Sequence, residues 1–378
     1  MIYLFVFIVS VFCTFLAQKW VKTKPLFLFF SAIAILFPSA LAGFRDIGIG
    51  TDTIVYSRDI FYLVKSQHYS FVGFLKNYTN NEYQGLEFVY LLLNYLVSIF
   101  FNEVGWFHFF ANLIVVLFFY LAAYDNRRKA SMWMVMLFFL FLFYNASLNI
   151  MRQSMAVAMS LYAFKHIENK EWIKSVIWLV IIFNTHSSGI FFAFLFIVHW
   201  LSYLKKRRLS TALQVTLAAA TSLFFIYFNS MLTLLVVFSD RFVKYSQLYA
   251  NENKTAVGKT FLVFYILILF IMMFSKKQVY EKQFRNISFY IYCKILGILF
   301  FLTSLISVTA SRISWYLNVL DCIFIPRVLH DISLKNKRFS NALTFLVVFA
   351  TLIFWYWIIV ISGVHETYPY RSRILDIR

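Results

Sequence analysis

Long apolar segments separated by short polar turns follow one another along almost the whole chain. A helix needs about 20 apolar residues to cross the roughly 30 Å hydrocarbon core of a bilayer, and fewer where its ends snorkel. By that measure thirteen segments are candidate membrane spans: 2–17, 26–43, 86–101, 106–124, 131–145, 152–167, 173–185, 187–203, 211–229, 260–275, 287–308, 313–330 and 341–361. The pattern predicts an all-α, polytopic bundle of transmembrane helices that forms a single integral membrane domain over residues 1–378.

Basic residues gather in six short polar stretches between these segments, and these hold 21 of the 35 Lys and Arg residues. Because short cytoplasmic loops collect Lys and Arg, we place all six inside. Three candidate spans lie between the first two clusters, so one of them does not cross the membrane. Segment 86–101 carries Glu87 and Asn94, and we expect it to be a re-entrant or interfacial helix. The expected topology has about twelve spans, both termini outside, an outer segment at 44–105 and an outer loop at 230–259.

The composition changes the picture in two ways. Hydrophobic residues make up 62% of the chain and charged residues 13%, against roughly 45–50% and about 25% in soluble domains, which excludes a soluble enzyme and a disordered chain. The net charge of +19 would suggest nucleic acid in a soluble protein, but basic loops and lipid headgroups account for it in a membrane protein. No nucleic-acid partner is expected. The three cysteines and seven histidines form no metal-ligand pattern, so no metal or other cofactor is predicted.

The remaining basic residues fall mostly on the expected outer face, where positive charge is normally scarce. Arg45, Arg152 and Arg312 lie where predicted spans reach that face, and a charge that faced lipid there would be costly. We therefore expect them to line an outward-facing basic cavity suited to an anionic ligand. Arg241 and Lys244 in the 230–259 loop belong to the same outward set.

Arg152 continues a polar stripe along one helix face. Asn145 and Asn149 precede it at helical spacing, small residues follow it, and Gln153 lies beside it. The plainer interpretation is a seam of hydrogen bonds between helices, since Ser and Asn often join spans in this way. A lone arginine fits that interpretation poorly, which favours a functional role for Arg152.

Two further residues are candidates for moving a proton. His186 lies in a turn between two spans, where it can exchange a proton near neutral pH; the alternative is a histidine at headgroup level with no role. Asp52 follows a glycine-rich stretch, and its alternative role is to cap a helix that begins at Thr53. Lys294 and Asp321 lie at similar depths in antiparallel spans and are predicted to form a structural ion pair.

Several short motifs in a fixed order resemble the EpsG/Wzy family of bacterial polysaccharide polymerases, from about residue 40 to 371. They are Gly43-Phe44-Arg45 with Gly50-Thr51-Asp52 and Tyr56, Asn149-Ile150-Met151-Arg152-Gln153 with Ala156, Asn184-Thr185-His186-Ser187-Ser188, Arg312-Ile313-Ser314-Trp315-Tyr316 with Pro326, and Tyr368-Pro369-Tyr370. The resemblance implies an O-antigen or capsule polymerase in the bacterial inner membrane that uses undecaprenyl-diphosphate-linked oligosaccharides at the outer face, without metal or cofactor. A chain-length regulator is a possible partner.

The family's chemistry gives the candidate residues roles. Guanidinium groups bind phosphate oxygens in pairs and stay charged, so Arg152, Arg312 and Arg45 would hold the leaving diphosphate. His186 would be the base toward the acceptor hydroxyl, with Asp52 as the second choice. The other expected substrate-binding residues are Gln153, Asn149, Tyr56, Arg241, Lys244 and Tyr316.

Two other functions fit many of the same features. A flippase or transporter for the same lipid-linked glycan would need cationic residues deep in the membrane and repeated halves, and neither is evident. An O-antigen ligase would be expected to have a much larger outer loop than 230–259.

Overall fold

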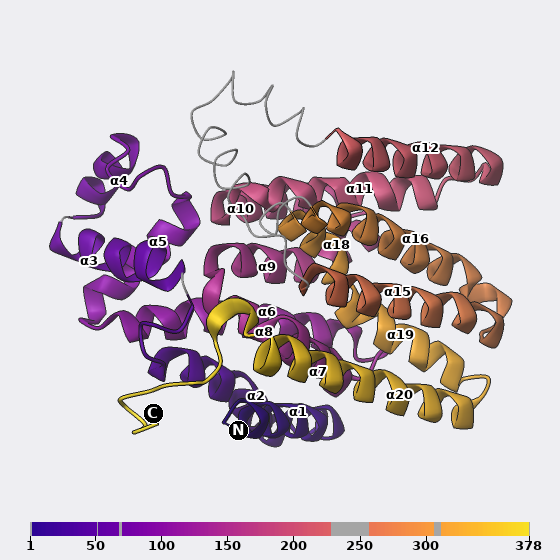
Figure 1. Cartoon of the computed structure of the whole chain (residues 1–378), viewed down its shortest axis with the longest axis horizontal. Helices are drawn as coiled ribbons and strands as arrows, with labels where there is room; N and C mark the ends of the chain where they lie inside the picture. Colours follow the sequence, from indigo (N-terminus) through magenta and orange to yellow (C-terminus); the bar gives the residue numbers. More distant parts are fainter. Residues whose placement is uncertain (1, 51, 68–69, 228–256, 306–310, 378) are drawn as a thin grey trace.

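The computed structural model describes residues 2–50, 52–67, 70–227, 257–305 and 311–377, and over this part of the chain it is built from helices with no extended strand (Figure 1). The α-helices are α1 (Ile2–Lys19), α2 (Lys24–Phe44), α3 (Asp59–Ser66), α4 (Phe71–Thr79), α5 (Phe88–Phe100), α6 (Val104–Asn126), α7 (Met132–Leu142), α8 (Tyr144–Asn149), α9 (Met151–Glu168), α10 (Trp172–Thr185), α11 (Phe191–Ser202), α12 (Arg207–Ile226), α15 (Val257–Ser275), α16 (Phe284–Phe301), α18 (Trp315–Asn318), α19 (Asp321–Ser333) and α20 (Lys337–Trp355).

The predicted all-α polytopic bundle is confirmed. Six helical stretches in the described chain are long and apolar enough to cross a membrane: Ile2–Lys19, Lys24–Phe44, Val104–Asn126, Gly258–Gln278, Glu281–Ser304 and Lys337–Ile361. Shorter apolar helices accompany them, among them Phe88–Phe100, Met132–Leu142, Trp172–Thr185 and Ser187–Ser202. The count of twelve spans stays a prediction, as do the single-domain organisation and the orientation of the chain. Most of the 230–259 loop lies outside the described residues.

The short helices α3, α4 and α5 gather at one end of the long helices, which we call the lobe end (Figure 1). They have a small apolar core of their own, which includes Ile60, Val64, Phe74 and Leu91. Helix α5 has 13 residues and therefore measures only about 20 Å at 1.5 Å per residue, short of the bilayer core. Whether 86–101 crosses the membrane stays a prediction.

Helix α2 packs closely on both α1 and α6, and small residues explain why. Pro38 inside α2 has no N–H for the carbonyl of Ala34, and the Ser10 hydroxyl of α1 donates to that carbonyl instead at 2.6 Å. Near the lobe end, a Cβ on Gly105 of α6 would lie 2.7 Å from the carbonyl oxygen of Gly43 of α2. The absence of side chains at both positions lets the two backbones touch, which fixes the start of the segment that follows α2.

The opposite end of the bundle carries structural ion pairs. Arg327 belongs to the last of the six basic stretches that the sequence analysis places inside. It is only 5% exposed, and it donates to both carboxylate oxygens of Glu168. It also donates to Asn126, so it joins three helices rather than facing water. Deeper in the bundle, Lys294 pairs with Asp321 and donates to Asn318 at 3.0 Å. The predicted structural pair of Lys294 and Asp321 is confirmed.

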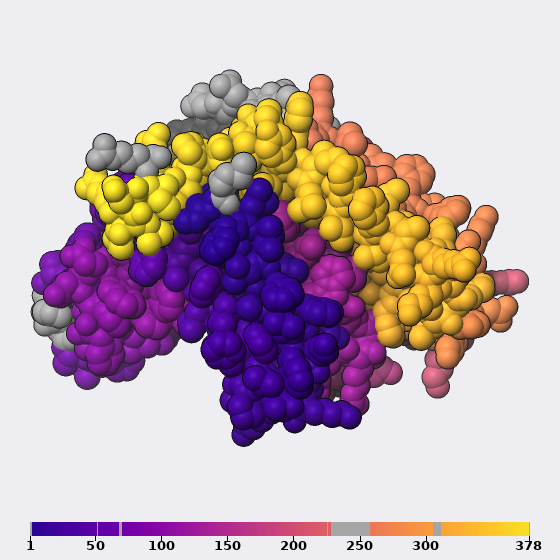
Figure 2. Space-filling model, turned by 90° about the horizontal axis from the view of Figure 1, so that it is seen from below, coloured from indigo at the N-terminus to yellow at the C-terminus, as the bar shows by residue number. Residues whose placement is uncertain are grey.

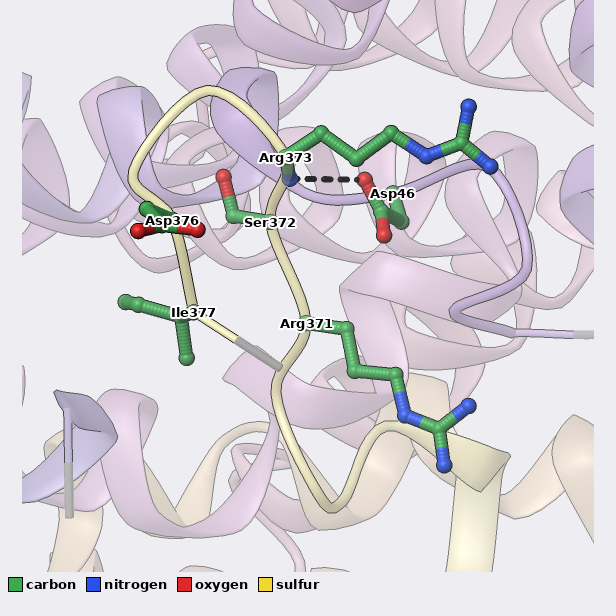
Figure 3. A pocket seen from close by; sticks show the side chains of 6 residues that line it. All are labelled: Asp46, Arg371, Ser372, Arg373, Asp376 and Ile377. Atoms are coloured by element: carbon green, nitrogen blue, oxygen red, sulfur yellow. Dashed lines mark hydrogen bonds between the residues drawn. The ribbon is translucent and has the colours of Figure 1, made fainter.

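The C-terminal segment after α20 folds back along the lobe end. It lies against the first helices, as Figure 2 shows for the yellow and indigo regions. Tyr370 donates to the carbonyl of Leu41 at 2.9 Å, and the amide of Asp46 donates to the carbonyl of Arg371 at 2.9 Å. Here an open pocket of about 650 Å³ is lined by Asp46, Arg371, Ser372, Arg373, Asp376 and Ile377, with the two arginine side chains on the same side of the tail (Figure 3).

Candidate functional site

A break between helices α8 and α9 places Arg152 at the lobe end. Ile150 has non-helical backbone angles (φ −91°, ψ 61°), so α9 begins at Met151 and Arg152 lies in its first turn. The first turn of a helix carries unpaired N–H groups and the positive end of the helix dipole. The guanidinium of Arg152 therefore adds a full charge to a place where the backbone is already electropositive. The two predicted spans 131–145 and 152–167 become three helices because the chain also breaks at Phe143, between α7 and α8.

Glu87, just before α5, is the direct partner of Arg152. Nη1 of Arg152 lies 2.8 Å from Oε2 of Glu87, and the backbone amide of Ser187 donates to Oε1 of the same carboxylate at 3.0 Å. Both side chains are mostly buried, at 18% and 15% exposed. Burial alone would raise the pKa of Glu87, but the charge of Arg152, with His186 and the Ser187 amide, holds it below its usual value. The carboxylate is ionised at neutral pH.

Aromatic rings cover one face of the Arg152 guanidinium. Its Cζ lies 4.4 Å from the centre of the Tyr56 ring, which comes from the π-helical turn η1 (Ile54–Arg58), and 5.7 Å from the centre of the Tyr90 ring of α5. The hydroxyl of Tyr90 in turn donates to the carbonyl of Tyr56 at 2.6 Å. Such stacking orients the guanidinium without neutralising it. Tyr56, which the sequence analysis expected to bind substrate, therefore lies beside Arg152.

His186 lies in the turn that joins α10 to the short 3₁₀ helix η2 (Ser187–Ile190). Its Nδ1 accepts the backbone N–H of Ser188 at 3.2 Å and lies 2.7 Å from the Ser188 hydroxyl. That hydroxyl is 3.0 Å from the hydroxyl of Tyr316. Burial, with Arg152 and Arg312 nearby and opposed by Glu87, lowers the pKa of His186 to about 4. His186 is neutral at pH 7, and Tyr316 reaches it through Ser188.

Arg312 approaches the same place from the other half of the chain. It begins the short 3₁₀ helix η6 (Arg312–Ser314), and its backbone carbonyl accepts a hydrogen bond from Nε2 of Gln153 at 2.9 Å. The predicted span 313–330 is accordingly broken into η6, α18 and α19. Burial and then the charge of Arg312 lower the pKa of His365 to about 3, so His365 is a neutral neighbour of Arg312.

Asp52 and Asn149 are joined directly. Oδ1 of Asn149 accepts the backbone N–H of Asp52 at 3.0 Å, so Asn149 fixes the glycine-rich segment beside the α8–α9 break. Gly50 makes this approach possible, because its φ of +85° suits glycine and a Cβ there would lie 3.1 Å from Cα of Asn149. Asn149 thus positions the chain before Tyr56, rather than facing Arg152 in the described contacts.

Arg45 lies behind the break. It is 5% exposed, its Nη1 donates to the carbonyl of Leu148, and its Nη2 lies 3.5 Å from the sulfur of Met151. Burial lowers the pKa of Arg45 to about 10, so it keeps its charge at neutral pH. In the described structure Arg45 ties the two residues on either side of the α8–α9 break together.

Together, the structure brings Arg152, His186, Arg312, Gln153, Tyr56 and Tyr316 to one end of the bundle, with Asp52, Asn149 and Arg45 next to them. Arg241 and Lys244 lie outside the described residues. No group of three or more His, Cys, Asp or Glu residues in the described chain could hold a metal ion.

Residues 27–372 match the model of the EpsG family, which is most of the chain. The chain belongs to the EpsG family. It is therefore a polysaccharide polymerase-like membrane protein, and the family resemblance drawn from the motifs is confirmed. No curated protein and no solved structure matches it. In this EpsG-family chain all four internal motifs contribute to the lobe-end site, and the matched region ends in the C-terminal segment that folds across it.

Glu87 is the main residue that sequence reasoning missed. It counted only as a polar residue that argued against a span at 86–101, because it stands alone and outside the recurring motifs. Its meaning depends on a contact 65 residues away along the chain with Arg152 and one 100 residues away with Ser187. No local spacing carries that signal. Ser188 enters the sequence analysis only as the last residue of the His186 motif, and His365 does not enter it.

Proposed function

We propose that this chain is a polymerase that joins undecaprenyl-diphosphate-linked oligosaccharide repeat units into O-antigen or capsular polysaccharide at the outer face of the bacterial inner membrane. The growing glycan is transferred from its lipid diphosphate to the non-reducing sugar of the incoming unit, and undecaprenyl diphosphate is released. The observation that carries the proposal is the charge around His186, where Arg152 and Arg312 supply two positive groups against one carboxylate, Glu87.

An anionic leaving group fits this excess of positive charge. As the bond between the anomeric carbon and the phosphate oxygen breaks, negative charge grows on the diphosphate and must be stabilised. Arg152 has one Nη committed to Glu87, which leaves the rest of its donor fork for phosphate oxygens. The first turn of α9 adds its electropositive N–H groups. Loss of one such donor typically costs roughly 10²–10³ in rate.

The remaining residues position these groups. Gln153 holds η6, and hence Arg312, through the Arg312 carbonyl. Tyr56 stacks on Arg152, and Asn149 holds the segment that leads to Tyr56. Arg45 stabilises the α8–α9 break on which Arg152 depends. Arg241 and Lys244 are proposed to contact the glycan.

Purified protein supplied with synthetic lipid-linked repeat units tests the proposal. We expect a ladder of polymer with release of the lipid diphosphate. Movement of the lipid-linked unit across a vesicle bilayer without polymer would indicate a flippase, and transfer only to a lipid A core acceptor would indicate a ligase. Either outcome would contradict the polymerase assignment.

A further inference from the structure

The carboxylate of Glu87 is placed and charged like a general base. Each oxygen accepts one hydrogen bond, Oε2 from Arg152 and Oε1 from the backbone of Ser187, so each keeps acceptor capacity for a further proton donor. The two bonds come from different elements, α9 and the turn before η2, and they fix the carboxylate between the guanidinium and the turn that carries His186. No other carboxylate in the described chain pairs with Arg152.

His186 has the opposite character. A backbone N–H can only donate, and the N–H of Ser188 points at Nδ1 of His186, so Nδ1 carries no proton. The proton of the neutral ring is therefore on Nε2. With Nδ1 occupied by Ser188 and Nε2 already protonated, the ring has no free lone pair toward a substrate. In this state His186 is a hydrogen-bond donor.

Asp52 is also less suited to be the base. Its described hydrogen bond is made by its backbone N–H to Asn149, and its carboxylate has no ion pair with Arg152 or His186 in the described chain. Glu87, by contrast, touches the guanidinium that the proposed function assigns to the diphosphate.

We infer that Glu87 is the general base of the transfer and that His186 donates a hydrogen bond from Nε2 to the substrate; this inference rests on the proposed function. The Glu87 carboxylate accepts the proton of the acceptor hydroxyl as that oxygen forms its bond to the anomeric carbon of the donor. The bond from that carbon to the phosphate oxygen breaks, and its electron pair leaves with the diphosphate, whose charge Arg152 and Arg312 stabilise. Water then takes the proton from Glu87.

The test measures kcat and the KM for the lipid-linked unit with purified variants. We expect Glu87→Gln to lose roughly 10²–10⁴ in kcat, the usual worth of a general base, with KM changed far less. Formate, a small carboxylate, should restore part of the rate to Glu87→Ala. Asp125→Asn is the matched control, since it removes a partly buried carboxylate that pairs with Lys165 at 2.6 Å at the other end of the bundle.

His186 gives an independent arm. Gln keeps an N–H donor and an acceptor oxygen but cannot take up a proton, so His186→Gln should stay well above His186→Ala in kcat. Either of two results overturns the inference: Glu87→Gln matches the Asp125→Asn control in kcat, or His186→Gln is as inactive as His186→Ala. The second result can be obtained even if Glu87→Gln does not fold. If the wild-type protein makes no polymer from lipid-linked units, the proposed function fails. If the wild-type protein makes polymer and the Glu87 variants make it at the wild-type rate, the proposed function stands and only this inference fails.

Discussion

Removal of Arg152 should lower both the stability of the protein and its polymerisation activity, because Arg152 pairs with Glu87 at the lobe end. Arg152→Ala leaves the Glu87 carboxylate at 15% exposure without its ion-pair partner and takes a cation from the Tyr56 ring. A hydrogen bond to a charged group contributes about 1.5–3 kcal/mol, and an exposed to partly buried cation–π contact about 0.5–2 kcal/mol. We therefore expect the free energy of unfolding to fall by about 2–5 kcal/mol.

The double variant separates stability from activity. In Arg152→Ala with Glu87→Gln no ionised carboxylate is left unpaired, so part of the lost stability should return, with a coupling free energy of about 1.5–3 kcal/mol between the two sites. Polymerisation should not return, because the proposed function needs the charge of Arg152 and the inferred proton transfer needs the Glu87 carboxylate. Equilibrium unfolding in mixed micelles, followed by tryptophan fluorescence, gives the first quantity. Polymer ladders in a polymerase-null strain give the second.

Two results would refute this reasoning. Additive effects on stability, with no coupling, would mean that the 2.8 Å contact between Arg152 and Glu87 contributes nothing. A normal ladder from Arg152→Ala would remove Arg152 from the proposed diphosphate site; we expect single lipid-linked units to accumulate instead. Arg152→Lys keeps the charge without the planar fork and should fall between wild type and Arg152→Ala in activity. Lys165→Met, which breaks a partly exposed pair, should cost at most about 1 kcal/mol.

Three more predictions follow from the same site. Gly50→Ala should destabilise the protein by about 1–2 kcal/mol and lower its activity, because φ is +85° there and a Cβ would crowd Asn149. Gly48→Ala is the control: a Cβ there would have nothing within 4 Å, so this variant should behave as wild type in the same unfolding and ladder assays. The pKa of His186 is about 4 in the folded protein, below its ordinary 6.5, so the free energy of unfolding should fall as the pH drops from 6.5 to 4 while Arg152 and Arg312 stay charged. In unfolding measurements over this pH range, His186→Gln should show a weaker dependence on pH than wild type. An unchanged dependence would contradict the lowered pKa of His186. EDTA should leave the rate of the purified polymerase unchanged, and a loss restored by a divalent cation would refute the metal-free chemistry.

The sequence predicted the fold class and named most of the residues that the structure brings together at the lobe end, because both depend on signals that are local or repeated. Apolar length predicts spans, and the motif around Arg152 lies where two predicted spans meet. The helical spacing expected from Asn149 to Arg152 is wrong, because the helix is interrupted at Ile150 and the distant Arg45 contacts both sides of that break. Glu87 could not be found in this way, because its role comes from a contact between the lobe and two other elements. Arg327 could not be predicted for the same reason. Its sequence neighbours indicate a basic loop, but a contact with the distant Glu168 buries it.

Four arginines of this chain show how neutralisation and burial separate structural from ligand-binding roles. Both oxygens of Glu168 neutralise Arg327, whereas Arg45 keeps its charge but is buried behind the α8–α9 break and donates to a backbone carbonyl, so neither guanidinium is available to a ligand. Arg152 shares one contact with Glu87, and Arg312 has no ion pair in the described chain. Because both act on His186 with only one opposing carboxylate, the positive charge left over is concentrated at this end of the bundle. On the proposed function, an anionic diphosphate binds where that imbalance lies, and its departure restores the imbalance for the next unit.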